Sequence, residues 1–137
     1  MTSSRPNKYG KINRDKVVGF TWDNKQYFGY EGDTLASALL ANDIKIIARS
    51  FKYHRPRGVM SCGIEESGAL VTIGSNSKTD PNVRATTQEI YPGLLAKGQN
   101  AFPSVNFDFA GINNYLSRFF SAGFYYKTFM GLPPFEW

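Results

Sequence analysis

The chain has one cysteine and one histidine, Cys62 and His54, which lie eight residues apart. Thiolates hold most iron–sulfur clusters, and plant-type [2Fe–2S] loops space their first three ligands as Cys-x4-Cys-x2-Cys, with a fourth far downstream. Counted from Cys62, the second and third positions fall on Ser67 and Leu70. Leu70 has no donor atom, so we expect no metal ligand set. Cys62 is then a structural or incidental thiol, with a reactive thiol beside nearby cations as the alternative.

General acid–base or nucleophilic catalysis is equally poorly supported by the residue types. His54 has no nucleophile or carboxylate beside it in the sequence. Glu65 and Glu66 are adjacent, so in regular structure their side chains diverge and cannot act as a close carboxylate pair. We expect both to be surface carboxylates, and we expect no catalytic residue in this chain.

A basic cluster covers positions 49–57, where cations alternate with an aromatic residue and no acid occurs. Four roles are open: docking of a subunit or domain, contact with a cofactor phosphate, a solvated loop, and binding of nucleic acid. We favour docking through Lys52, Tyr53 and His54. Arg55 and Arg57, on either side of Pro56, are the candidate phosphate contacts. No nucleic-acid recognition motif accompanies the cluster.

Aromatic residues are concentrated after position 100. Residues 101–137 contain twelve of them and only four charged residues. Such a segment is too apolar to be a free disordered tail, so it must bury against its own domain or a partner surface. The stretch "GFYYKTFM" at 123–130 is either an anchor buried against a following domain or a strand of the small domain. We favour the anchor, with Phe124, Tyr125, Tyr126 and Phe129 as docking residues. Lys127 is a further candidate for a phosphate or flavin oxygen.

The composition limits the class of protein. The chain has 137 residues, 42% of them hydrophobic, and a formal net charge of +5. No run of about 18 apolar residues is present, so a membrane span is not expected. The N-terminus lacks an apolar signal-peptide core. With one cysteine a disulfide framework is excluded, and we expect a cytoplasmic protein.

Hydrophobic periodicity predicts the elements. Alternation in "VVGFTW" and "QYFGYE" around Asp23-Asn24 predicts a β-hairpin. Residues 33–42 predict a helix capped by Asp33 or Thr34 and ended by Asn42. The rest of the chain gives further strands at 44–48, 69–73 and 83–90, with a polar loop at 50–61 and a turn or loop at 75–82. This order predicts an α+β fold of the β-grasp (ubiquitin-like) type at 15–92, after a mobile arm at 1–14 and before an aromatic extension at 93–137.

Three strings, "GDTLASALLAN", "RSFKYHRPRG" and "AGFYYKTFM", closely resemble the N-terminal region of the α subunits of heterotetrameric sarcosine oxidases. The resemblance runs from about Lys11 to Trp137. It implies a ferredoxin-like β-grasp domain without its [2Fe–2S] cluster. In such an assembly the α subunit joins β, γ and δ subunits, and the enzyme converts sarcosine to glycine and H2O2 while passing a one-carbon unit to tetrahydrofolate.

The resemblance also implies where the cofactors lie. FAD belongs to another subunit, FMN lies between subunits, and NAD binds a later domain of the α subunit. The glycine-rich fingerprint G-x-G-x-x-G of a dinucleotide site is absent from the 137 residues. We therefore expect no cofactor on this chain alone and no activity from it. The alternative is a stand-alone ubiquitin-like module that binds another protein.

Overall fold

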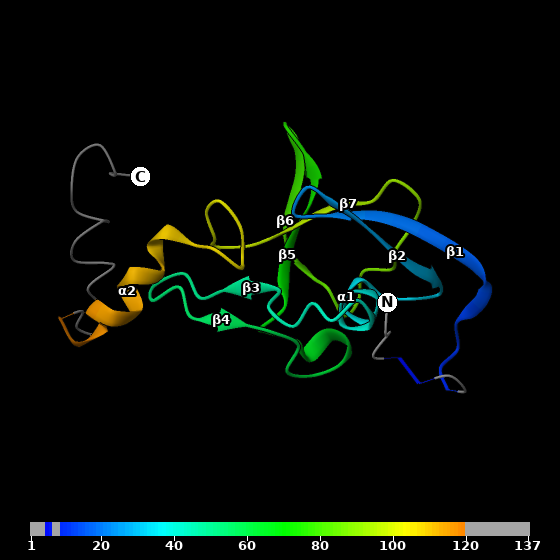
Figure 1. Cartoon of the computed structure of the whole chain (residues 1–137), viewed down its shortest axis with the longest axis horizontal. Coiled ribbons are helices and arrows are strands. Elements are labelled where there is room, and N and C mark those ends of the chain that lie inside the picture. Colours follow the sequence, from blue (N-terminus) through cyan, green and yellow to red (C-terminus); the bar gives the residue numbers. More distant parts are fainter. Residues whose placement is uncertain (1–4, 7–8, 120–137) are drawn as a thin grey trace.

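A mixed five-stranded sheet packed on one helix forms the centre of the computed structural model, which describes residues 5–6 and 9–119 (Figure 1). The strands lie in the order β2-β1-β7-β5-β6. Only β1 and β7 are parallel, and the other neighbours are antiparallel. The core between sheet and helix includes Phe20, Leu35, Leu39, Val71 and Leu94. The α+β fold expected from the sequence is therefore confirmed.

The first two strands form the expected hairpin. β1 (Asn13–Trp22) pairs with β2 (Lys25–Glu31) through a two-residue turn. Asp23 and Asn24 both have positive φ, at 44° and 64°. This is the type I′ geometry whose twist matches that of the strands, and Asn and Asp tolerate it without glycine. Val18, Phe20 and Trp22 alternate into the core as their spacing predicted.

The helix α1 (Leu35–Ala41) begins and ends where the sequence indicated. The Thr34 side chain accepts the Ser37 amide at 3.2 Å, and Asn42 is the C-terminal cap. The left-handed residue that follows is Asp43 rather than Asn42. Leu35, Ala38 and Leu39 are fully buried against the sheet. Helix α1 is therefore held to the sheet by its apolar face.

Segment 83–90, expected to be a strand, is mostly a support for the helix. β6 ends at Arg84, and the chain then turns beneath the start of α1. The carbonyls of Ala85 and Gln88 accept the amides of Ala36 and Leu35 at 2.8 and 2.7 Å. These bonds satisfy helix amides that have no partner within the helix. The prediction of a strand was wrong for residues 85–90, because the backbone carbonyls of Ala85 and Gln88 bond to helix amides instead of to a neighbouring strand.

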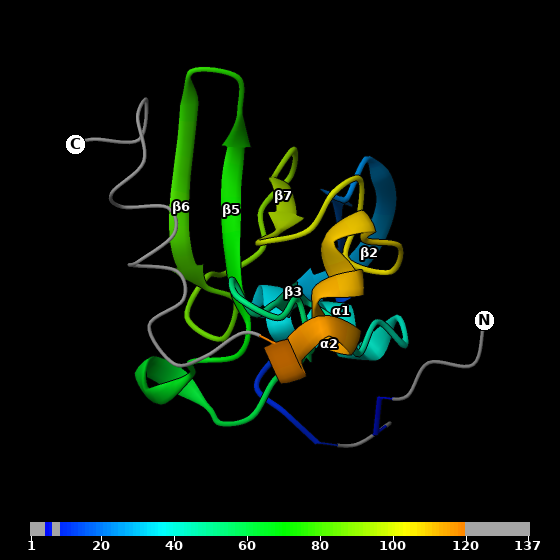
Figure 2. The same ribbon diagram turned by 90° about the vertical axis from the view of Figure 1, so that its left-hand side faces the viewer.

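The polar segment 75–82 was expected to be a turn or loop. Asn76 and Ser77 do form a turn, but residues 78–82 belong to a strand. β5 (Leu70–Ser75) and β6 (Lys78–Arg84) form a long hairpin, seen side by side in Figure 2. β6 is an edge strand whose residues are nearly all exposed. A strand without a buried face does not show alternation, and its Pro81 is tolerated because edge strands need fewer backbone donors.

The sheet continues past position 92, where we placed the end of the domain. β7 (Leu95–Gly98) lies between β1 and β5, and Val105 is buried in the same core. This strand runs parallel to β1 and joins the β1–β2 hairpin to β5 in one mixed sheet. The sequence "LAKG" is too short and too mixed to show a strand pattern.

The expected third strand at 44–48 is mostly irregular. Only β3 (Ala48–Arg49) forms, and it pairs with β4 (Pro56–Arg57) in a separate two-stranded sheet. Ile47 is fully buried and its amide donates to the Arg57 carbonyl. Apolar residues here fill the core from a connecting segment. The loop expected at 50–61 contains β4, because Pro56 and Arg57 pair with Arg49 and Ala48.

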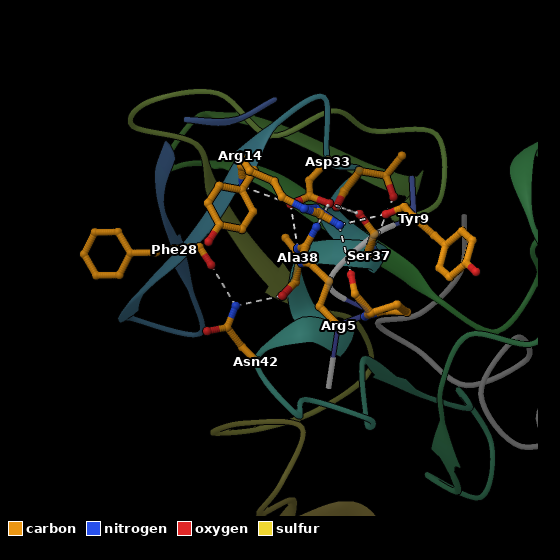
Figure 3. Close-up of polar contacts among 11 residues, drawn as sticks. Arg5, Tyr9, Arg14, Phe28, Asp33, Ser37, Ala38 and Asn42 are labelled. Atoms are coloured by element: carbon orange, nitrogen blue, oxygen red, sulfur yellow. Dashed lines mark hydrogen bonds and ion pairs between the residues drawn. The ribbon is translucent and has the colours of Figure 1, made fainter. Parts of the chain in front are cut away.

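Side chains from α1 and its flanks cover the outer edge of β2 (Figure 3). Asn42 donates to the Phe28 carbonyl at 2.8 Å, and Asp33 accepts the Tyr30 amide at 2.9 Å. Covered backbone groups cannot pair with a foreign strand. Arg5 also reaches this edge, where its guanidinium donates twice to Asp33, at 2.8 and 2.7 Å. The N-terminal arm, expected to be mobile, is thus bound to the domain at Arg5.

Short helical turns complete the described part of the chain. They are η1 (Gly63–Glu65), η2 (Phe109–Gly111), α2 (Ile112–Tyr115) and η3 (Leu116–Phe119). The last three lie beyond the β3–β4 hairpin, at one end of the molecule (Figure 1). Across the residues described, no helix is long and apolar enough to cross a membrane.

Candidate docking surface

The basic cluster forms the tip of the β3–β4 hairpin, from Arg49 at the end of β3 to Arg57 at the end of β4. Ser50 closes it, because its amide donates to the Arg55 carbonyl at 3.0 Å and its hydroxyl accepts the Arg55 amide. His54 has a φ of 52° and turns the chain at the tip. Lys52 and Arg55 lie 5.0 and 4.8 Å from the centre of the Tyr53 ring. The loop is therefore an ordered turn in which two cations flank one aromatic ring.

A buried carboxylate ties this loop to a segment more than fifty positions later. The Asp108 side chain is fully buried, and its Oδ2 lies 2.6 Å from Nδ1 of His54 and 3.7 Å from Nε of Arg49. Its Oδ1 accepts the amides of Phe102 and Ala110. Burial acts to raise the pKa of Asp108, but the Phe102 amide and the His54 imidazole outweigh it and hold the pKa below its ordinary value. Asp108 is therefore an anion at neutral pH.

Further bonds join the two segments. Arg49 donates from Nε to the Val105 carbonyl and from Nη1 to the His54 carbonyl, both at 2.8 Å. Arg55 donates to the Asn114 side chain at 2.9 Å. These contacts build one surface from two parts: the basic loop (residues 49–57) and the aromatic segment (residues 102–119). We call the two together the docking surface.

The aromatic segment presents its large apolar side chains to solvent. Phe107 stacks edge-on against Phe109 at 5.2 Å, and Phe102 lies 6.3 Å from Phe109. All of them are more than half exposed, and the segment also exposes Tyr115 and Phe119, as the basic loop exposes Phe51. Exposed aromatic groups of this extent beside arginines have the composition of a protein interface. A depression of about 440 Å³ lies between the two parts, lined by Arg49, His54, Asp108 and Tyr115 among others.

The structure brings the expected residues of the basic loop together on one surface. Lys52, Tyr53, His54 and Arg55 lie on the docking surface, although only 17% of the His54 side chain is exposed because it faces Asp108. Arg57 lies on β4, with its carbonyl bonded to Ile47. The remaining candidates, Phe124, Tyr125, Tyr126, Lys127 and Phe129, lie outside the described residues.

Sequence reasoning missed the partner of His54. Asp108 is one of only four charged residues in the aromatic region, which was the one available signal. The pair has no nucleophile bonded to it among the described residues, and its carboxylate is fully occupied. The arrangement can hold two segments in register, and its role is that of a structural hydrogen bond to a buried carboxylate.

Glu66, expected on the surface, is buried. It is 1% exposed and lies in the loop between Gly58 and Leu70. Its Oε2 accepts the amides of Met60 and Ser61 at 2.8 Å, and its Oε1 accepts those of Gly68 and Ala69. Its neighbour Glu65 is exposed, as expected. Cys62, in the same loop, is a free and exposed thiol.

Comparison with known proteins places these features in context. Residues 15–101 match the family described as 2Fe-2S iron-sulfur cluster binding domain. Sarcosine oxidase subunit alpha of Rhizobium meliloti (strain 1021) is 52% identical over 134 residues, which are 98% of this chain and 14% of that protein. Sarcosine oxidase subunit alpha of Corynebacterium sp. (strain U-96) is 42% identical over 89 residues, or 63% of this chain and 9% of that protein.

A solved structure, that of L-proline dehydrogenase from P. horikoshii, aligns with 67% of this chain and 17% of its own, at 22% identity and a TM-score of 0.48. The chain spans 14% or less of the length of each of the two sarcosine oxidase subunits that it resembles.

Proposed function

Because the chain belongs to the family of 2Fe-2S iron-sulfur cluster binding domains, we propose that it is a cluster-less structural module of an oxidoreductase, at the N-terminal end of a sarcosine-oxidase-type α subunit. The sequence identity of 52% along nearly the whole chain supports this relationship. The module's role is to complete the subunit and to support its cofactor-bearing neighbour.

The residues present do not fit the cluster that names the family. A [2Fe–2S] cluster takes four cysteines, or two cysteines and two histidines. The chain has one of each. Leu70, at the third position of the ligand spacing counted from Cys62, has no donor atom. In the described part of the chain, no group of three or more histidine, cysteine or acidic side chains gathers where it could hold a metal. The proposed function therefore includes no reaction or electron-transfer step at a cluster.

The proposed assembly oxidatively demethylates sarcosine to glycine, with H2O2 as a product and transfer of the one-carbon unit to tetrahydrofolate. In this proposal FAD belongs to another subunit, FMN lies between subunits and NAD binds a later domain of the α subunit. The β, γ and δ subunits are the proposed partners. The chain contributes no catalytic residue and is inactive alone. The proposed compartment is the cytoplasm, and neither nucleic acid nor a membrane is a proposed partner.

The docking surface is the observation that carries this role. Its aromatic segment lies at the C-terminal end of the described residues and exposes large apolar side chains. In the longer relatives, most of the polypeptide lies outside the region that matches this chain. Burying several aromatic groups that are each more than half exposed would stabilise an association strongly. Both edges of the sheet are poor sites for pairing with another strand. The Asn42 and Asp33 side chains bond to the backbone of β2, and Pro81 leaves β6 without one backbone N–H. Docking through the basic loop and the aromatic segment is therefore favoured over addition of a strand.

Several candidate contacts belong to this proposal. Lys52, Tyr53 and Arg55 contact acidic and aromatic groups of the neighbour, while Phe124, Tyr125, Tyr126 and Phe129 extend the apolar contact. Arg57 and Lys127 are the remaining candidates for a cofactor phosphate at the boundary.

Native mass spectrometry of the chain isolated from its source cells, with an absorption spectrum of the same fraction, tests the proposal. We expect larger companion masses and flavin absorption bands. A colourless chain without companions, or one bound to a single protein without flavin, would refute the oxidase role. The second result would leave a ubiquitin-like binding module.

Variants locate the contact. Arg55→Glu combined with Phe109→Ala should weaken association with the flavin-bearing companions by at least tenfold, because it reverses a charge and removes an exposed ring. Lys78→Glu is the matched control, since Lys78 is exposed on β6, away from the docking surface. Equal association of both variants would exclude the docking surface as the contact.

A further inference from the structure

The loop from Gly58 to Leu70 is wound around one buried carboxylate. Four backbone amides converge on Glu66, two from each side of it: Met60 and Ser61 on one oxygen, Gly68 and Ala69 on the other. All four donors belong to the same loop. A carboxylate has about four lone-pair sites, so these bonds fill its capacity.

The arrangement compensates for the burial of a charge. Burial acts to raise the pKa of Glu66, but the amides of Ser61, Met60, Gly68 and Ala69 outweigh it and lower the pKa to about 2. Hydrogen bonds from amides to an ionised acceptor are roughly twice as strong as neutral ones. The centre of the loop is therefore a fixed negative charge held by backbone dipoles.

The backbone is adapted to this close winding. A Cβ at Gly68 would lie 2.6 Å from the Gly58 carbonyl oxygen, and a Cβ at Gly58 would lie 2.5 Å from that of Lys45. Both obstacles are backbone atoms, which cannot move aside as a flexible side chain can. Two glycines are thus required where the loop closes around the carboxylate.

The carboxylate lies inside the segment over which cluster ligands would be spaced. Counted from Cys62, those positions are 62, 67 and 70, and Glu66 lies between the first and second. Loops that bind iron–sulfur clusters also direct hydrogen bonds at a negatively charged centre, namely the cluster sulfurs. The converging amides are the shared feature, and the nature of the anion is the difference.

We propose that Glu66 is the resident anion of this loop, so that its carboxylate takes the organising role of a metal cluster and the module folds without iron. The module consequently supplies no electron-transfer centre to the protein it belongs to. This inference rests on the loop geometry and the family membership, and it holds whether or not the docking surface binds the proposed partner.

Amide hydrogen exchange on the full chain, followed by NMR, tests the role of the carboxylate. Glu66→Gln retains the size of the side chain but presents an NH2 group to one pair of amide donors. At least one pair, Met60 and Ser61 or Gly68 and Ala69, should exchange about 10- to 100-fold faster, as the loss of charged hydrogen bonds implies. Glu65→Gln is the matched control and should change none of the four. Unchanged protection in Glu66→Gln would overturn the proposal.

A second measurement uses the native chain and does not depend on the folding of a variant. The chain is purified with a chelator, then incubated anaerobically with Fe²⁺ and sulfide and desalted. We expect no retained iron by elemental analysis, no visible cluster absorption and the same amide protection before and after. Two irons per chain with cluster absorption, or a chelated chain whose loop amides are unprotected, would overturn the proposal. Neither result bears on whether flavin-containing companions are found.

Discussion

Asp108 lies 2.6 Å from His54 across 54 positions of sequence, and this contact joins the basic loop to the aromatic segment. The carboxylate also fixes its own segment, through the Phe102 and Ala110 amides. One buried side chain therefore orders both parts of the docking surface. The segment that carries the exposed aromatic groups is therefore joined to the basic loop by hydrogen bonds.

Replacement of Asp108 by Asn should loosen the aromatic segment. The amide has the same shape, but it lacks the charge and turns an NH2 group toward a donor. We expect the free energy of unfolding to fall by about 1–3 kcal/mol, measured by urea denaturation, with altered NMR shifts across residues 102–119. Asp80→Asn, on exposed β6, should stay within about 0.5 kcal/mol of the native chain. Equal stability of both variants would contradict the role given to Asp108.

Arg5 should be required for full stability although it lies near the N-terminus. Asp33 is 1% exposed, and the pair is joined by two hydrogen bonds, with the guanidinium 5.2 Å from the centre of the Tyr30 ring. Arg5→Met leaves a buried carboxylate without its cation, which costs about 3 kcal/mol.

Arg5→Lys should lose less, because an ammonium keeps the charge but not the paired geometry. Thermal unfolding of both variants measures which of them has lost more stability. Lys11→Ala is the control, since Lys11 is exposed and should be neutral. A native-like Arg5→Met would show that the arm does not stabilise the domain.

The atoms packed around Gly98 leave no room for a side chain at this position. A Cβ there would lie 2.0 Å from Cγ1 of Val105 and 2.5 Å from the Ile47 carbonyl oxygen. Gly98→Ala should therefore lower the free energy of unfolding by about 2 kcal/mol, since overpacking of this kind costs 1–3 kcal/mol. Gly19→Ala is the comparison, because its nearest atoms are 3.5 Å away, and it should be neutral or slightly stabilising. Similar chemical denaturation midpoints for both would be the contrary result.

The sequence was sufficient for elements whose signals are local. Alternation of Val18, Phe20 and Trp22 gave the first strand, and the cap at Thr34 gave the helix start. It was insufficient for β6 and β7. β6 is exposed and therefore shows no alternation, while the four residues of β7 become a strand only because β1 and β5 lie on either side.

The site residues show the same division between local and distant signals. The cations of the basic loop were visible in the sequence, but the distance from His54 to Asp108 depends on how the chain returns after β7. Glu65 and Glu66 look alike in sequence, and one is exposed while the other is buried. Their difference is set by the direction of four backbone amides, which no spacing of side chains encodes.

The stability of the loop around Glu66 should depend on pH in a defined window. The pKa is about 2 in the folded chain against an ordinary 4.5. A lowered folded-state pKa contributes stability that is fully present above pH 4.5 and is lost as the pH falls toward 2. The shift corresponds to about 3 kcal/mol at neutral pH. Asp33 and Asp108, whose pKa values are also lowered, add to the loss in the same direction.

Urea denaturation between pH 6 and pH 2.5 measures this dependence. The native chain should lose stability steadily below about pH 4.5, and Glu66→Gln should lose less over the same interval because one of the titrating carboxylates is absent. Glu65→Gln should follow the native curve, since Glu65 is exposed. Parallel curves for the native chain and Glu66→Gln would show that the four amides do not hold an ionised carboxylate, and the loop would then need another organising centre.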